Sequence, residues 1–254
     1  MGLISRIAEW REDRRLGELQ VSTDDWQRAL GDWQVYQRFC GESRARLHDL
    51  ALRLLLRKAL VGAHGLDLDD HMRLRIAGMA AVPILELGLE WYDAWQTLVI
   101  YDGPFVAEHE WVDEFGIAHA ERSELCGEAG FQGPVVLSLD DVRTAGGPQG
   151  HNVVLHELAH TLDMRREGAN GAPPLHPDMD PAAWKADLSA AWRDLERRVS
   201  AGEPAPIDEY ALEAPAEFFA VLTEVFFEQP AALAETWPAV FRHLSDFYRQ
   251  DPRD

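Results

Sequence analysis

Apolar residues in the first part of the chain recur at the spacing of amphipathic helices. Trp26, Leu30 and Trp33 lie at i, i+4 and i+7, behind a Ser-Thr-Asp sequence that begins at Ser22 and can cap a helix. The same periodicity continues over residues 47–55 and again over 69–87, where Pro83 is expected to kink or end the helix. These stripes predict that residues 1–90 form a helical N-terminal part, and that the apolar faces of its helices pack into the hydrophobic core.

Short β-branched and apolar runs follow, separated by turn signals rather than by helical patterns. They predict strands at 97–101, 105–112 and 134–139, in a small mixed or antiparallel sheet. Helical periodicity then returns, and the expected helices cover about 150–165, 181–200, 214–228 and 230–249. The sequence therefore predicts a mostly helical α+β fold, in which residues 1–254 form one compact unit and residues 91–254 carry the sheet and the active-site helices.

The charge of the chain narrows the classes of partner. Its 254 residues include 24 Lys and Arg against 44 Asp and Glu, a formal net charge of −20. A surface this acidic repels phosphate backbones and anionic lipids, so we expect no direct nucleic-acid binding and favour a basic partner or a bound cation. The longest uncharged apolar run covers only residues 76–85, too short for a membrane span. With no signal-peptide pattern, and with only Cys40 and Cys126, we expect a cytoplasmic protein.

The candidate chemistry lies in an HExxH motif at residues 156–160. On a helix, His156 and His160 are about 40° apart, so both imidazoles can reach one metal ion. Glu157 lies about 100° from His156, beside this face, which is the position of a base acting on a metal-bound water. The alternative interpretation is a pair of exposed histidines on an amphipathic helix.

A catalytic zinc site needs a third protein ligand. The best candidate region is residues 210–224, where Glu217 and Glu224 share one face of a helix that is apolar nearly all round. Buried carboxylates are costly unless a metal or a metal-bound histidine compensates them, although both could also be surface residues. Asp163 is a candidate to hold the distal ring nitrogen of one histidine, or else an exposed carboxylate at the helix end.

Several segments of the chain resemble one family. HELAHTLD at 156–163 is followed by EYALEAPAEFFAVLTEVFFEQP and WPAVFRHLSDFYRQDP, and is preceded by LRIAGMAAVPILELGLEWY and PVVLSLDDV. Together these segments resemble the Mlc titration factor A family of bacterial zinc peptidases. That family is related to the metallopeptidase domain of anthrax lethal factor, a gluzincin with a glutamate as third ligand.

The resemblance implies a zincin-like fold with one Zn²⁺ per chain. It implies that His156, His160 and Glu217 are the metal ligands, that Glu157 is the general base, and that Tyr210 stabilises the tetrahedral intermediate. It implies a cytoplasmic, aminopeptidase-like enzyme acting on a peptide substrate. Because the founding member titrates the glucose repressor Mlc, it also implies an Mlc-type transcriptional repressor as a partner. The alternative is a non-catalytic zinc-binding regulatory protein that titrates such a repressor.

Overall fold

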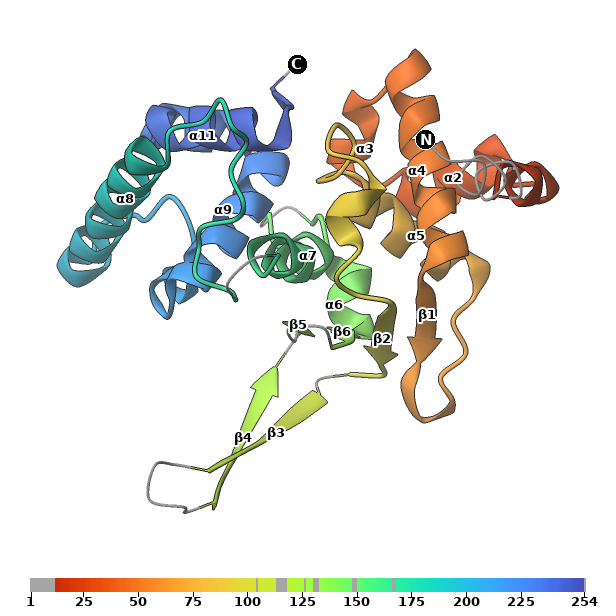
Figure 1. Ribbon diagram of the computed structural model, residues 1–254, viewed down its shortest axis with the longest axis horizontal. Helices are drawn as coiled ribbons and strands as arrows, with labels where there is room; N and C mark the ends of the chain where they lie inside the picture. Colours follow the sequence, from red (N-terminus) through yellow and green to blue (C-terminus); the bar gives the residue numbers. More distant parts are fainter. Residues whose placement is uncertain are drawn as a thin grey trace.

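The computed structural model describes residues 12–103, 105–112, 118–125, 127–129, 133–147, 150–165 and 168–253. The helices of residues 23–81 form one side of the molecule, and the helices of residues 181–248 form the other (Figure 1). The helix that carries the HExxH motif, α7 (Val153–Asp163), lies between them and contacts both groups.

The N-terminal part contains the helices that the apolar stripes predict. They are α2 (Thr23–Leu30), α4 (Gly41–Arg57) and α5 (Asp70–Ala81), whereas the short helix α3 (Gln34–Arg38) was not predicted. Ser22 caps α2 in a reciprocal capping box with Asp25. Trp33 lies beyond the end of α2 and is the N-cap residue of α3, so the last position of the predicted stripe falls between the two helices. Helix α5 ends before Pro83, because proline has no backbone N–H with which to continue the helical hydrogen bonds.

The sheet is mixed, as expected. Its order is β1-β2-β6-β5, built from β1 (Ala59–Gly62), β2 (Thr97–Tyr101), β6 (Val135–Ser138) and β5 (Gly127–Ala129). Strand β2 pairs in parallel with β1 and β6, whereas β5 pairs antiparallel with β6. The all-helical expectation for residues 1–90 is therefore wrong at β1. A four-residue apolar run has no periodicity of its own, and this one forms a strand because it finds β2 as a partner.

A two-stranded antiparallel hairpin, β3 (Phe105–Val112) and β4 (Ala118–Leu125), extends away from the helices (Figure 1). The sequence predicted β3, but neither β4 nor β5. Cys40 is a free, exposed thiol, whereas Cys126 lies outside the described residues.

Proline positions shape the C-terminal helices. These are α6 (Leu139–Thr144), α7, α8 (Pro181–Ala201), α9 (Pro215–Glu228), α10 (Pro230–Thr236) and α11 (Pro238–Tyr248). The expected single helix over 230–249 is wrong, because Pro238 interrupts it and begins α11. Short 3₁₀ turns η1 (Ala63–Gly65), η2 (Leu89–Tyr92) and η3 (Glu209–Leu212) complete the fold.

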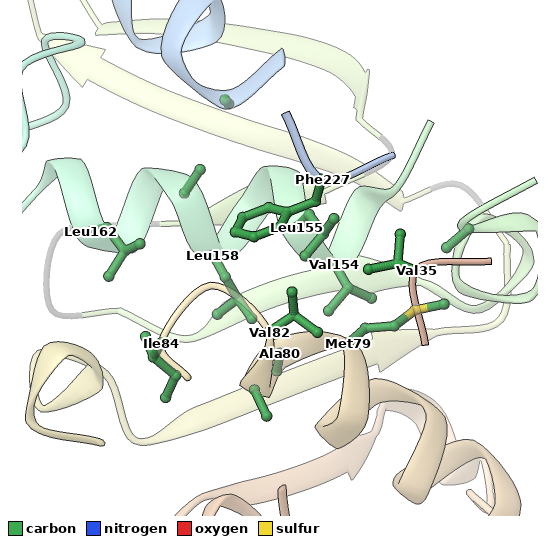
Figure 2. Close-up of a cluster of buried hydrophobic side chains, with 14 of the residues drawn as sticks. Val35, Met79, Ala80, Val82, Ile84, Val154, Leu155, Leu158, Leu162 and Phe227 are labelled. Carbon is green, nitrogen blue, oxygen red and sulfur yellow. The ribbon is translucent and has the colours of Figure 1, made fainter. Parts of the chain in front are cut away.

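The core fixes the orientation of α7. Leu155, Leu158 and Leu162 are each 0% exposed. They lie in one cluster with Val82 and Ile84, which follow α5, and with Phe227 of α9 (Figure 2). Burying this face leaves His156 and His160 directed away from the leucines. Within the described residues, no helix combines the length and the hydrophobicity needed to cross a bilayer.

Candidate metal centre

Helix α7 presents both histidines of the motif to the first turn of α9. His156 Nε2 lies 3.0 Å from Glu217 Oε2, and His160 Nε2 lies 3.4 Å from Glu217 Oε1. Glu217 stands at the third position of α9, behind Pro215, where a carboxylate is also stabilised by the helix dipole. The three side chains thus converge from two helices that are far apart in the sequence.

The donor set fits a divalent transition metal. One ligand atom from each of His156, His160 and Glu217 can be chosen so that all lie within 4.8 Å of one another. Ligands about 2.0–2.2 Å from a tetrahedral zinc lie about 3.3 Å from each other, close to the contacts seen here. Two imidazole nitrogens and one carboxylate oxygen are ligands that zinc accepts, with a fourth position open to water or substrate.

The electrostatics of the centre favour positive charge. Burial disfavours the charged form of His156, but hydrogen bonds with Glu217 and Glu224 outweigh it and raise its pKa to about 10. Burial likewise opposes the charge on Glu217, yet its contacts with both histidines hold its pKa well below its usual range. A bound cation would neutralise the same Glu217 carboxylate that otherwise favours the protonated form of His156.

Glu157 follows His156 on α7 and is buried beside the centre. Its side chain is 4% exposed, and its Oε2 has no hydrogen-bond partner among the described residues. Burial raises the pKa of this carboxyl to about 7, although His156 and His160 act to lower it. A buried carboxylate with one unpaired oxygen beside a metal site can accept a proton from a reacting water.

Tyr210 lies on η3, beside the centre. Its ring centroid is 6.1 Å from that of His156, and the residue is 41% exposed. Burial of part of the ring, the charges of Glu217 and Glu213, and a hydrogen bond to Glu217 raise the pKa of its hydroxyl. The phenol therefore stays protonated and can donate a hydrogen bond.

The structure separates the two carboxylates that the sequence left open as third ligand. Glu224 is 6% exposed and lies behind His156, with its Oε1 2.7 Å from His156 Nδ1. This contact leaves His156 Nε2 free to face Glu217 and the centre. A buried carboxylate was expected to be compensated either by a metal or by a histidine. Glu224 corresponds to the second possibility, because its contact is with His156. Two further polar residues were not predicted. Asn152, the N-cap of α7, donates its backbone N–H to Glu224 and its side-chain amide to Glu228, the last residue of α9. Their only signal in the sequence was their place at the ends of the two helices.

Both roles considered for Asp163 are wrong. The side chain is 1% exposed, so it is not a surface carboxylate. Its two oxygens accept hydrogen bonds from the backbone N–H groups of Asn170, Gly171 and Ala172, so it holds the following loop and not a histidine. Asp163 is the last residue of α7, and the loop that follows brings these three N–H groups back to its carboxylate. His176 of the same loop lies against Phe247, and it is not part of the centre.

Comparison with known proteins places the chain in a family. A family model described as "Glucose-regulated metallo-peptidase M90" matches residues 7–249. The chain belongs to the M90 metallopeptidase family. "Mlc titration factor A" of Salmonella arizonae is 42% identical to this M90 chain over 213 residues, covering 83% of this chain and 85% of the relative. The proteins of the same name from Salmonella gallinarum and Salmonella paratyphi B are each 41% identical, covering 83% of this chain and 80% of the relative. Membership of M90 implies a metal ion, and His156, His160 and Glu217 are the candidate group for it.

Proposed function

We propose that this chain is a zinc-dependent, aminopeptidase-like peptidase that hydrolyses peptide bonds. His156, His160 and Glu217 would hold one Zn²⁺, with Glu157 as general base and Tyr210 as a donor to the substrate. The observation that carries the proposal is the convergence of two imidazoles and one carboxylate beside a buried glutamate with an unpaired oxygen. Membership of the M90 family supports it.

The residues divide the chemistry of amide hydrolysis between them. Zinc in this position supplies a Lewis acid, which polarises the scissile carbonyl and makes a water molecule more acidic. Glu157 takes a proton from the attacking water and passes it to the leaving amine. The Tyr210 hydroxyl donates a hydrogen bond to the oxygen that gains negative charge as the carbonyl is attacked. Glu224 fixes the His156 ring through Nδ1.

Glu157→Gln tests this proposal because glutamine keeps the shape of the side chain and cannot act as a base. We expect full zinc content, measured by atomic emission, and a fall of about 10²–10⁴-fold in hydrolysis of chromogenic aminoacyl and short peptide substrates. Tyr210→Phe should also retain zinc, with kcat lower by about 10²–10³-fold.

The matched control is Glu196→Gln, the same substitution at an exposed position of α8, which should behave as wild type. A zinc-loaded Glu157→Gln protein that turns over at the wild-type rate would remove Glu157 from the base role. Zinc bound by the wild type with no cleavage of any substrate would favour the non-catalytic alternative.

We propose a second function because the curated relatives carry the name Mlc titration factor A. In this function the chain binds an Mlc-type transcriptional repressor in the cytoplasm and titrates it, either in addition to catalysis or instead of it. The acidic composition, with a net charge of −20, supports binding to a partner that has a basic face. Calorimetric titration of the purified repressor into wild type and Glu157→Gln tests this directly. Equal binding by both would show that titration does not need catalysis, and no binding by either would refute the second function.

A further inference from the structure

A chain of hydrogen bonds joins the metal centre to the N-terminal helices. Its first link is Glu224, whose Oε1 contacts His156 Nδ1 at 2.7 Å. The other carboxylate oxygen, Oε2, accepts the backbone N–H of Asn152 at 2.6 Å. Both oxygens of Glu224 are therefore engaged, which fixes the rotation of the carboxylate and with it the plane in which it meets the imidazole.

Asn152 connects this link to the next one. It is 0% exposed and caps α7, because its Oδ1 accepts the N–H of Leu155 at 3.2 Å. Its Nδ2 donates to Glu228 Oε1 at 2.8 Å. One buried asparagine thus fixes the start of the HExxH helix and holds two carboxylates, Glu224 and Glu228, that stand one turn apart on α9.

The last link comes from the N-terminal part of the chain. Trp33 is 1% exposed, and its indole Nε1–H donates to the same Glu228 Oε1 at 2.8 Å. Arg38 of α3 donates to the backbone carbonyl of Glu228 at 3.3 Å, so α3 also closes the C-terminal end of α9. The segment around Trp33 is therefore bonded to the helix that carries Glu217 and Glu224.

We propose that Trp33, Glu228, Asn152 and Glu224 are positioning residues for the ligand His156, so that the N-terminal helices help to set the affinity of the metal centre. A buried series of hydrogen bonds restricts its side chains to one arrangement, because leaving any buried donor or acceptor without its partner costs free energy. Partners behind a metal-binding histidine typically change metal affinity by about 10–100-fold when they are removed. The inference rests on the proposed metal site and extends it to Trp33, more than a hundred residues before the motif.

The test measures metal binding rather than catalysis. The affinity of the metal-free protein for zinc is measured by competition with a chromogenic chelator, and the visible absorption spectrum of the Co²⁺ form reports ligand geometry. Glu224→Gln should weaken zinc binding by about 10–100-fold, because one amide oxygen cannot serve both His156 and Asn152. Trp33→Phe removes a single hydrogen bond and should weaken zinc binding by about 2–10-fold with a changed Co²⁺ spectrum.

The matched control is Trp95→Phe. Trp95 is 3% exposed, and its Nε1 has no hydrogen-bond partner among the described residues, so the variant loses ring volume without losing a hydrogen bond. It should bind zinc as the wild type does. Adding Trp33→Phe to Glu224→Gln should cost less zinc affinity than Trp33→Phe costs alone, because Glu224→Gln has already broken the same series of hydrogen bonds.

Glu228 gives a second pair of variants in case Trp33→Phe folds poorly. Glu228→Gln keeps an oxygen that can accept from both Trp33 and Asn152, and it should retain wild-type zinc affinity. Glu228→Leu has similar volume but no acceptor, and it should weaken binding. Wild-type affinity and an unchanged Co²⁺ spectrum in both Trp33→Phe and Glu228→Leu would overturn this inference alone. A wild-type protein that binds neither zinc nor cobalt would overturn the proposed function together with it.

Discussion

Asp163→Ala should destabilise the protein strongly, although Asp163 binds no partner in the metal centre. Its buried carboxylate accepts N–H groups from Asn170 at 2.7 Å, from Gly171 at 2.6 Å and from Ala172 at 2.9 Å. In the alanine variant the N–H of Ala172 still has Asn170 Oδ1 at 3.0 Å, but the other two donors lose their acceptor.

The expected loss of stability in Asp163→Ala follows from these hydrogen bonds. Hydrogen bonds to a charged acceptor contribute about 1.5–3 kcal/mol each, so the two lost bonds amount to about 3–6 kcal/mol. Burial raises the pKa of Asp163, which shows that the charge itself is costly here and that its removal offsets part of the loss. We expect the free energy of unfolding to fall by about 2–4 kcal/mol, and the Tm to fall by about 4–16 °C.

Urea unfolding of chelator-treated protein, followed by tryptophan fluorescence, measures this change without a contribution from bound metal. Asp163→Asn should lose less stability, because its amide oxygen can still accept from Asn170 and Gly171. The control is Asp178→Ala in the same loop, where a carboxylate that is 63% exposed pairs with Arg249. It should cost less than about 1 kcal/mol. The reasoning is refuted if Asp163→Ala lies within about 0.5 kcal/mol of the wild type, or if Asp178→Ala costs as much.

Two further predictions concern the same half of the molecule. Gly171→Ala should lower the unfolding midpoint in urea more than Gly168→Ala does. Both glycines have positive φ, but a Cβ on Gly171 would lie 2.4 Å from the carbonyl oxygen of Pro215, whereas nothing lies within 4 Å at Gly168. Equal midpoints would contradict the packing argument. Asp194→Asn should lower stability at pH 7, and its difference from the wild type should shrink as the pH falls below about 3.8. Hydrogen bonds from Arg197 and other donors lower the folded-state pKa of Asp194, so its contribution is complete above the unfolded pKa and is lost as the folded form protonates. A difference that stays constant down to pH 3 would count against this assignment.

The local elements and the chemistry of the motif follow from the sequence because both are written in short-range patterns. The stripe around Trp26 and the serine cap at Ser22 give α2, and HExxH on an amphipathic helix gives the relative orientation of His156 and His160. The resemblance to a known family added Glu217, which the residue pattern alone could not separate from Glu224.

Tertiary structure decided how these elements meet. Glu217 and Glu224 share one face of α9, and only the position of α7 puts the first in front of the two histidines and the second behind His156. Strand β1 exists because β2 lies beside it. Trp33 reaches Glu228 across 195 residues. Asp163 binds a loop that returns to it only seven to nine residues later, but helical periodicity does not show where that loop turns back. Periodicity determines which face of a helix is buried, whereas the partner of a buried polar group depends on packing between segments distant in sequence, which no local pattern encodes.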